Sequence, residues 1–117
     1  MFRYRHLELL CRGPRTVVRV VDQTLRQEDI EDVAREWNHV ADCTHCRKLV
    51  VDCSNMEVVG TGVLSKLLVF QRRLKQKGAE LALCGVSLAV REVLSLTRLD
   101  RLFAIEERES RELVAVA

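Results

Sequence analysis

Long hydrophobic runs are missing from this sequence, and the one proline is Pro14. The longest dense apolar run, Leu67–Phe70, is far shorter than the roughly 20 residues that a helix needs to cross a bilayer. The first residues carry charges and no apolar stretch before a small-residue cleavage site, so no export signal is predicted. With neither export nor membrane insertion expected, we predict a cytoplasmic protein.

An excess of charge of one sign is also missing, because 19 Lys and Arg stand against 17 Asp and Glu. Aromatic residues are few: three Phe, one Tyr and one Trp. A broad basic field and a base-stacking surface are therefore both lacking, which disfavours a dedicated nucleic-acid binder. The composition, 48% hydrophobic and 31% charged, is typical of a folded globular chain. We expect a single domain over residues 1–117.

The five cysteines cannot all pair, and a reducing cytoplasm disfavours a disulfide framework. Three of them lie inside apolar runs and are predicted to be small core residues. They are Cys11, Cys53 and Cys84.

The other two cysteines form a CxxC sequence, Cys43 to Cys46, with His39 and His45 close by. Zinc needs four such ligands, and no second CxxC or spaced histidine pair completes a set. A thioredoxin-like site would need the CxxC after a strand and at the start of a helix, which is not the order predicted here. We therefore favour a plain loop, with no cofactor, and keep Cys43, Cys46, His39 and His45 as weak metal-ligand candidates.

Alternating and β-branched residues predict two strands, Leu7–Cys11 and 16–21, joined as a hairpin around Pro14. The hydrophobic period then changes to that of an amphipathic helix over 30–41, with Trp37 on its apolar side. The next segment, Lys48–Cys53, is apolar on both faces and predicts a central strand.

The second half of the chain repeats this alternation. A second helix is predicted over Thr61–Lys77, ended by Gly78, and a buried strand over Ala79–Val86. Ser87 is placed as the cap of a third helix whose apolar side comprises Ala89, Val90, Val93 and Leu94. A last strand at 103–105 and a short helix in the tail to Ala117 complete the order. We predict an α/β fold: a mixed sheet with helices packed on it.

The stretch from Leu49 to Phe103 resembles the STAS domain of bacterial anti-sigma factor antagonists. The shared pattern is a strand ending in Asp-x-Ser, a short hydroxyl-bearing turn and a helix that runs to a glycine. A strand ending in Cys-Gly and the segment VREVLSLTRLDRLF follow in the same order. Residues 16–42 also fit the family, so the resemblance extends over most of the chain.

The resemblance implies a protein–protein interaction module in transcription regulation, and not an enzyme. Members of the family bind an anti-sigma factor that is also a serine/threonine kinase and thereby free the sigma factor. Phosphorylation at the start of the second helix then breaks this contact. Laying the family's Asp-Ser-Ser-Gly-Leu turn on residues 60–64 puts Thr61 at the phosphoacceptor serine. The acid before it becomes Gly60, and a second family acid falls on Arg26.

The residues allow two interpretations of Thr61. A hydroxyl between two glycines at the start of a helix is accessible to a kinase, and phosphate would add about −1.5 to −2 charge there. The alternative is that Thr61 only caps the helix, which the missing acids favour. Without phosphorylation, the protein would be a scaffold subunit of a larger signalling or transport assembly. A homo-oligomer is one form that such an assembly could take.

The side of the second helix opposite its core stripe is a candidate docking face. Its members at helical spacing are Gly62, Ser65, Lys66, Val69 and Arg73, and Val69 is their one large apolar residue. An ordinary solvated face with one exposed valine is the alternative. The basic residues Arg72, Arg73, Lys75 and Lys77 are interpreted as a solvated helix end, with contact to acidic partners as the alternative.

Overall fold

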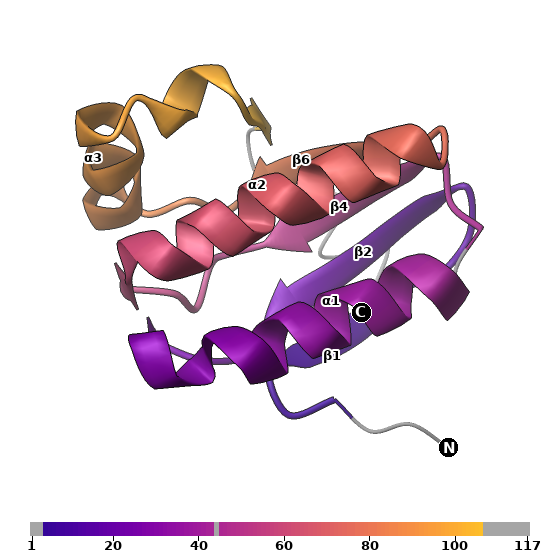
Figure 1. Cartoon of the computed structure of the whole chain (residues 1–117), viewed down its shortest axis with the longest axis horizontal. Helices are drawn as coiled ribbons and strands as arrows, with labels where there is room; N and C mark the ends of the chain where they lie inside the picture. Colours follow the sequence, from indigo (N-terminus) through magenta and orange to yellow (C-terminus); the bar gives the residue numbers. More distant parts are fainter. Residues whose placement is uncertain (1–3, 44, 107–117) are drawn as a thin grey trace.

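A five-stranded mixed sheet, ordered β1-β2-β4-β6-β7, carries α1 and α2 side by side on one face (Figure 1). A second, two-stranded sheet pairs β3 with β5. The structure is a computed structural model that describes residues 4–43 and 45–106. Its strands are β1 (Leu7–Cys11), β2 (Arg15–Val20), β3 (Thr24–Leu25), β4 (Lys48–Asp52), β5 (Val58–Val59), β6 (Glu80–Cys84) and β7 (Ala104–Glu106). Its α-helices are α1 (Ile30–Cys43), α2 (Thr61–Gln76) and α3 (Leu88–Leu96), and the short 3₁₀ helices are η1 (Gln27–Asp29) and η2 (Leu99–Arg101).

The predicted hairpin is confirmed, because β1 pairs antiparallel with β2. The prediction that Cys11 belongs to the core is wrong, since its side chain is exposed. The pairing register shifts between Leu9 and Cys11, and β1 is an edge strand. The shift breaks the alternation on which the sequence-based prediction depended.

The centre of the sheet is β4, which runs parallel to β2 on one side and to β6 on the other. Its side chains alternate between two faces: Leu49 and Val51 join the larger core cluster, whereas Val50 joins a smaller one. All three are at most 1% exposed. The predicted burial of this strand on both faces is confirmed, and so is the burial of Cys53 and Cys84.

The interface between α1 and α2 contains a stacked aromatic pair. The Trp37 ring stacks on Phe70 with ring centroids 5.7 Å apart and an angle of 20° between the planes. The predicted apolar stripes of α1 and α2 both belong to the main core cluster between the helices and the sheet. Each large apolar side chain buried there stabilises the fold by roughly 1.5–3 kcal/mol. Besides Trp37 and Phe70, the buried apolar residues are Ile30, Val33, Val40 and Ala41 on α1, with Val63, Leu64, Leu67 and Leu74 on α2.

The third helix begins as predicted, since the Ser87 side chain accepts a hydrogen bond from the backbone N–H of Val90 at 3.2 Å. Val90 and Leu94 are buried, but the placement of Ala89 on the apolar side is wrong because Ala89 is exposed. A methyl group adds too little burial to set the orientation of a helix. The predicted helix in the tail lies outside the described residues.

The strand predicted at 103–105 is present one residue later, as β7. No helix in the described part of the chain has the length and apolar character to span a membrane.

Candidate functional site

The segment that leads into α2 is held by the small sheet. β3 and β5 pair in parallel, with Leu25 opposite Val59. The backbone N–H of Gly60 then donates to the Leu25 carbonyl at 3.1 Å, and α2 begins at the next residue. The start of α2 is therefore fixed beside the segment that leads into α1. Figure 1 shows both helix starts, and α3, at the same end of the molecule.

Thr61 is the first residue of α2, and its side chain is exposed. The prediction that Thr61 caps the helix is wrong, because Gly60 occupies the N-cap position and no side chain caps the helix. Gly60 has extended backbone angles (φ −74°, ψ 149°), whereas Thr61 is already helical. The Thr61 hydroxyl thus stands at the positive end of the helix dipole without serving as its cap.

The two glycines beside Thr61 have different roles. Gly60 has an ordinary φ, and a β-carbon there would lie 3.6 Å from the Leu25 carbonyl oxygen, an ordinary contact. A β-carbon on Gly62 would lie 2.6 Å from Cδ1 of Ile30 and 2.8 Å from Oε1 of Gln27. Gly62 is therefore half-buried against the start of α1, and its predicted place on the outward side of α2 is wrong.

The other four predicted docking residues, Ser65, Lys66, Val69 and Arg73, are exposed, and Val69 has 60% of its surface accessible. The Ser65 hydroxyl donates to the Thr61 carbonyl at 3.2 Å. Arg73 is exposed but contacts Asp42 of α1 at 3.2 Å, so its charge is already partnered. The structure thus brings Thr61, Ser65, Lys66 and Val69 onto one accessible side of α2.

Two exposed apolar residues on elements at this end of the molecule were not predicted from the sequence. Val58 in β5 is 56% exposed and Leu88 at the start of α3 is 80% exposed. β5 and α3 are in contact, and the Ser87 hydroxyl lies 3.5 Å from the Met56 carbonyl. Val58 could not be identified from a sequence pattern, because a two-residue strand is too short to show an alternation of buried and exposed residues. Leu88, however, lies off the Val90–Leu94 row, and that signal could have identified it.

Arg26, at the position of the second family acid, is exposed and precedes η1. Its backbone N–H donates to the Asp29 carboxylate at 2.9 Å, which fixes the turn into η1. The residue before Arg26, Leu25, accepts the hydrogen bond from the Gly60 N–H, so the backbone at Arg26 lies close to the backbone that precedes Thr61. The surface next to Thr61 therefore carries a cation where the family has an acid.

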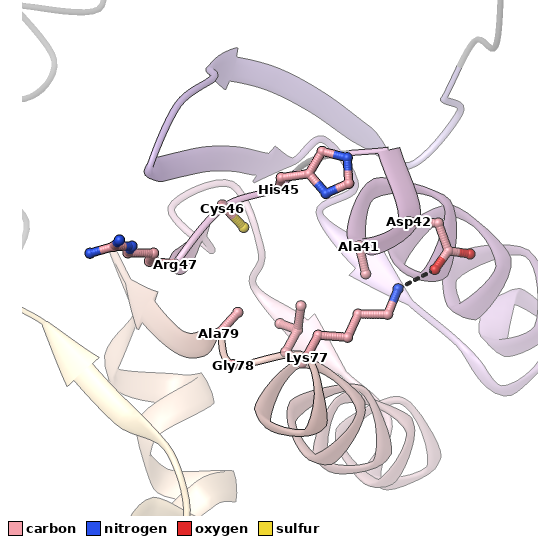
Figure 2. Close-up of a pocket in the computed structure, with 9 residues that line it drawn as sticks. Ala41, Asp42, His45, Cys46, Arg47, Lys77, Gly78 and Ala79 are labelled. Carbon is pink, nitrogen blue, oxygen red and sulfur yellow. Dashed lines mark hydrogen bonds and ion pairs between the residues drawn. The ribbon is translucent and has the colours of Figure 1, made fainter.

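A pocket of about 570 Å³ lies between the C-terminal ends of α1 and α2 (Figure 2). By the rise of an α-helix, it is about 22 Å along α2 from Thr61. Lys77 reaches across it to Asp42, and the sulfur of Cys46 points into it. The hydrogen bond from Lys77 holds the pKa of the Asp42 carboxyl below its ordinary value.

The four candidate metal ligands do not converge. The Cys43 sulfur lies 3.5 Å from Nε2 of His39, whose Nδ1 is 2.8 Å from the Tyr4 hydroxyl. Cys46 and His45 instead line the pocket of Figure 2. Across residues 4–43 and 45–106, no three His, Cys, Asp or Glu side chains are arranged to hold a metal ion. The CxxC therefore has no ligand set that the described residues complete.

A family model described as the STAS domain matches residues 11–111. No curated protein is similar enough in sequence to count as a match. Among solved structures, an anti-sigma-factor antagonist (STAS) domain protein from Planctomyces limnophilus is 25% identical, with a TM-score of 0.76 over 95% of this chain and 97% of that one. The anti-sigma factor antagonist SpoIIAA in its unphosphorylated form is 16% identical, with a TM-score of 0.73 over 92% and 90% of the two chains. An anti-sigma factor antagonist from Mycobacterium paratuberculosis is 22% identical, with a TM-score of 0.73 over 94% and 92%.

Proposed function

The chain belongs to the STAS domain family, and we propose that it acts in the cytoplasm as an anti-sigma factor antagonist. In this proposal it binds an anti-sigma factor of the serine/threonine kinase type and so regulates a sigma factor, without catalysing a reaction itself. The antagonists that share its fold support this class of partner. The binding surface is Gly60, Thr61, Ser65, Lys66, Val69, Val58 and Leu88.

The observation that carries the proposal is the exposed Thr61 at the first position of α2. Val58 precedes Thr61 by three residues, Val69 lies on the same helix, and Leu88 lies on α3, which contacts β5; in this proposal one partner covers all three exposed apolar residues together with the hydroxyl. A phosphate on Thr61 would place a dianion inside this contact, where its desolvation weakens binding. SpoIIAA is described in an unphosphorylated form, which supports a phosphate-dependent cycle in a protein of the same fold.

Arg26 is a cation near the proposed phosphorylation site. A phosphate on Thr61 would lie at the positive end of α2 and next to the segment that carries Arg26, and both stabilise a negative charge. Arg26→Glu replaces this cation by an anion. The change should therefore disfavour the phosphorylated form of Thr61 and leave the fold unchanged.

The test is co-purification with wild type, Thr61→Ala and Thr61→Glu as baits, with captured proteins identified by mass spectrometry. Gln76→Glu is the matched control, since it adds the same charge at the exposed other end of α2. We expect one kinase-type ATPase with wild type, Thr61→Ala and Gln76→Glu, and at least tenfold less with Thr61→Glu. Equal capture by all four baits would contradict the switch.

The second candidate function is a non-phosphorylated scaffold subunit. The acids that flank the family's phosphoacceptor are replaced by Gly60 and Arg26, and α3 exposes Leu96 as well as Leu88. An exposed apolar helix side suits association of copies or of other subunits. Light scattering after size-exclusion separates the two: a stable homo-oligomer that Leu88→Asp/Leu96→Asp converts to monomer supports the scaffold.

A further inference from the structure

A groove of about 620 Å³ lies between the C-terminal half of α2, the start of β6 and the chain entering β7. This volume is in the range of pockets that bind small organic molecules. Its lining includes the basic side chains Lys48, Arg72, Lys75 and Arg101, and its apolar part includes Leu68, Leu102 and Phe103. We call this the basic groove. It plays no part in the function proposed above.

The basic residues near the end of α2 divide into two pairs. Arg73 and Lys77, one turn apart, both contact Asp42 of α1. Arg72 and Lys75 border the basic groove instead, and neither forms an ion pair within the described part of the chain. The interpretation of all four as a solvated helix end is therefore incomplete, because one pair is neutralised by a carboxylate and the other is not.

The third cation comes from a different element. Arg101 ends η2, and it has no ion-pair partner among residues 4–43 and 45–106. The Gln71 amide donates to the Leu102 carbonyl at 2.7 Å, which ties the segment after η2 to α2. This hydrogen bond holds Arg101 on the same groove as Arg72 and Lys75.

The remaining charges of the groove do not cancel these three. Lys48 also lines it but pairs with Glu106. Glu80 is the one acidic residue in the described lining, and it lies in no ion pair with a described residue. Three cations against one carboxylate leave an excess of positive charge in a concave surface, where the field is focused and an anion is attracted.

The chemistry of the lining identifies the anion. Two guanidinium groups and one ammonium group present many N–H donors, which match the several oxygens of a phosphate better than a single carboxylate. Leu102, half exposed, and Leu68, half-buried, offer an apolar surface beside these donors. We infer that the basic groove binds a small soluble organic phosphate, with the phosphate on Arg72, Lys75 and Arg101 and the apolar part against Leu68 and Leu102.

The test uses phenyl phosphate as the probe, with inorganic phosphate and phenol for comparison. Binding is followed by NMR chemical-shift changes on the isotope-labelled full chain. We expect saturable shifts with phenyl phosphate that map to residues 68–75 and 101–104, weaker binding of inorganic phosphate and none of phenol. Shifts elsewhere, or no saturable binding at millimolar concentrations, would overturn the inference.

The variant pair is matched in charge and position. Arg72→Gln/Lys75→Gln removes two cations from the groove, and Arg73→Gln/Lys77→Gln removes two from the opposite flank of the same helix. We expect the first to weaken phenyl phosphate binding at least tenfold and the second less than twofold. Equal loss in both would mean that net charge alone attracts the probe, which overturns the site.

A second arm separates a soluble ligand from a lipid headgroup. Phosphatidylcholine vesicles containing phosphatidic acid are sedimented with the wild type and with Arg72→Gln/Lys75→Gln. We expect neither to sediment. Vesicle binding that the groove variant abolishes, without binding of phenyl phosphate, would replace the soluble ligand by a lipid and overturn the inference.

Discussion

The carboxylate of Asp52 occupies the space that any side chain at residue 85 would need. A β-carbon on Gly85 would lie 2.8 Å from Oδ1 of Asp52 and 3.1 Å from the backbone nitrogen of Ser54. Gly85 also has a φ of +64°, a conformation that glycine adopts without strain. The Asp-x-Ser turn after β4 and the Cys-Gly turn after β6 are therefore fitted to each other at the ends of adjacent strands.

Gly85→Ala should lower the free energy of unfolding by about 2–4 kcal/mol, from the left-handed backbone and the clash with Asp52 together. Gly78→Ala is the control, because Gly78 has a φ of +82° but open space around its α-carbon. It should cost only the backbone term, about 1–2 kcal/mol. Urea denaturation measures both, and an equal loss in the two variants would contradict the fitted turns.

Asp52→Ala should be strongly destabilising, because Asp52 is only 3% exposed. Its carboxylate accepts hydrogen bonds from the Ser54 N–H at 2.9 Å and from Nε of Arg19 at 3.3 Å. Removing it leaves both donors without this partner, at a cost of roughly 2–4 kcal/mol. Asp42→Ala, which removes an exposed ion-paired carboxylate, should cost far less. Thermal unfolding of both variants would contradict this ranking if their midpoints fell equally.

The cysteines should differ in reactivity toward iodoacetamide. Burial raises the pKa of the Cys53 thiol far above its ordinary value, and Cys84 is buried beside it in sequence-distant β6. Cys11 and Cys43 are exposed and should be alkylated first in the native protein. Cys53 and Cys84 should react only after unfolding in urea. Mass spectrometry of the peptides tests this. If Cys53 were labelled in the native protein as fast as Cys11, the burial of Cys53 would be contradicted.

Glu106 should contribute to acid sensitivity. Its hydrogen bond with Lys48, opposed by partial burial, holds the pKa of Glu106 below its ordinary value of 4.5. A carboxyl whose pKa is lowered by folding stabilises the protein above its unfolded pKa, and this stabilisation is lost as pH falls through the folded pKa.

Glu106→Gln should therefore be less stable than wild type at pH 7. As the pH falls from about 5 to about 3, through the ordinary pKa of 4.5 and below it, the variant should lose less stability than wild type. Denaturant midpoints across this range provide the measurement. If the stability of Glu106→Gln and of wild type depended on pH in the same way, the Lys48 contact would not stabilise the folded protein.

Periodicity predicted the elements that carry most of the fold. The stripe around Trp37, the two-faced strand β4 and the cap at Ser87 all follow from patterns within one element, and the structure has each of them. The strands β3 and β5 were missed, because two residues cannot establish a period. These two short strands nevertheless set where Thr61 stands.

The candidate site depended on relations between elements, which a single sequence does not encode directly. The position of Gly62 under Ile30 follows from how α1 crosses the start of α2, and no pattern within α2 predicts it. The separation of Arg72 from Arg73 around the helix could have been predicted from 100° per residue. That Asp42 neutralises only Arg73 and Lys77 required the packing of α1 against α2.

The stacked pair in the helix interface also gives this protein a built-in optical reporter. Trp37 is the one tryptophan of the chain and is 2% exposed, so its fluorescence should be emitted from an apolar environment and shift to the red on unfolding. Its partner ring, Phe70, stands on α2, the helix that begins at Thr61 and borders the basic groove. A ligand or a binding partner that tilts α2 by a small angle would alter that emission. Both proposed contacts could therefore be titrated by fluorescence on the unlabelled chain.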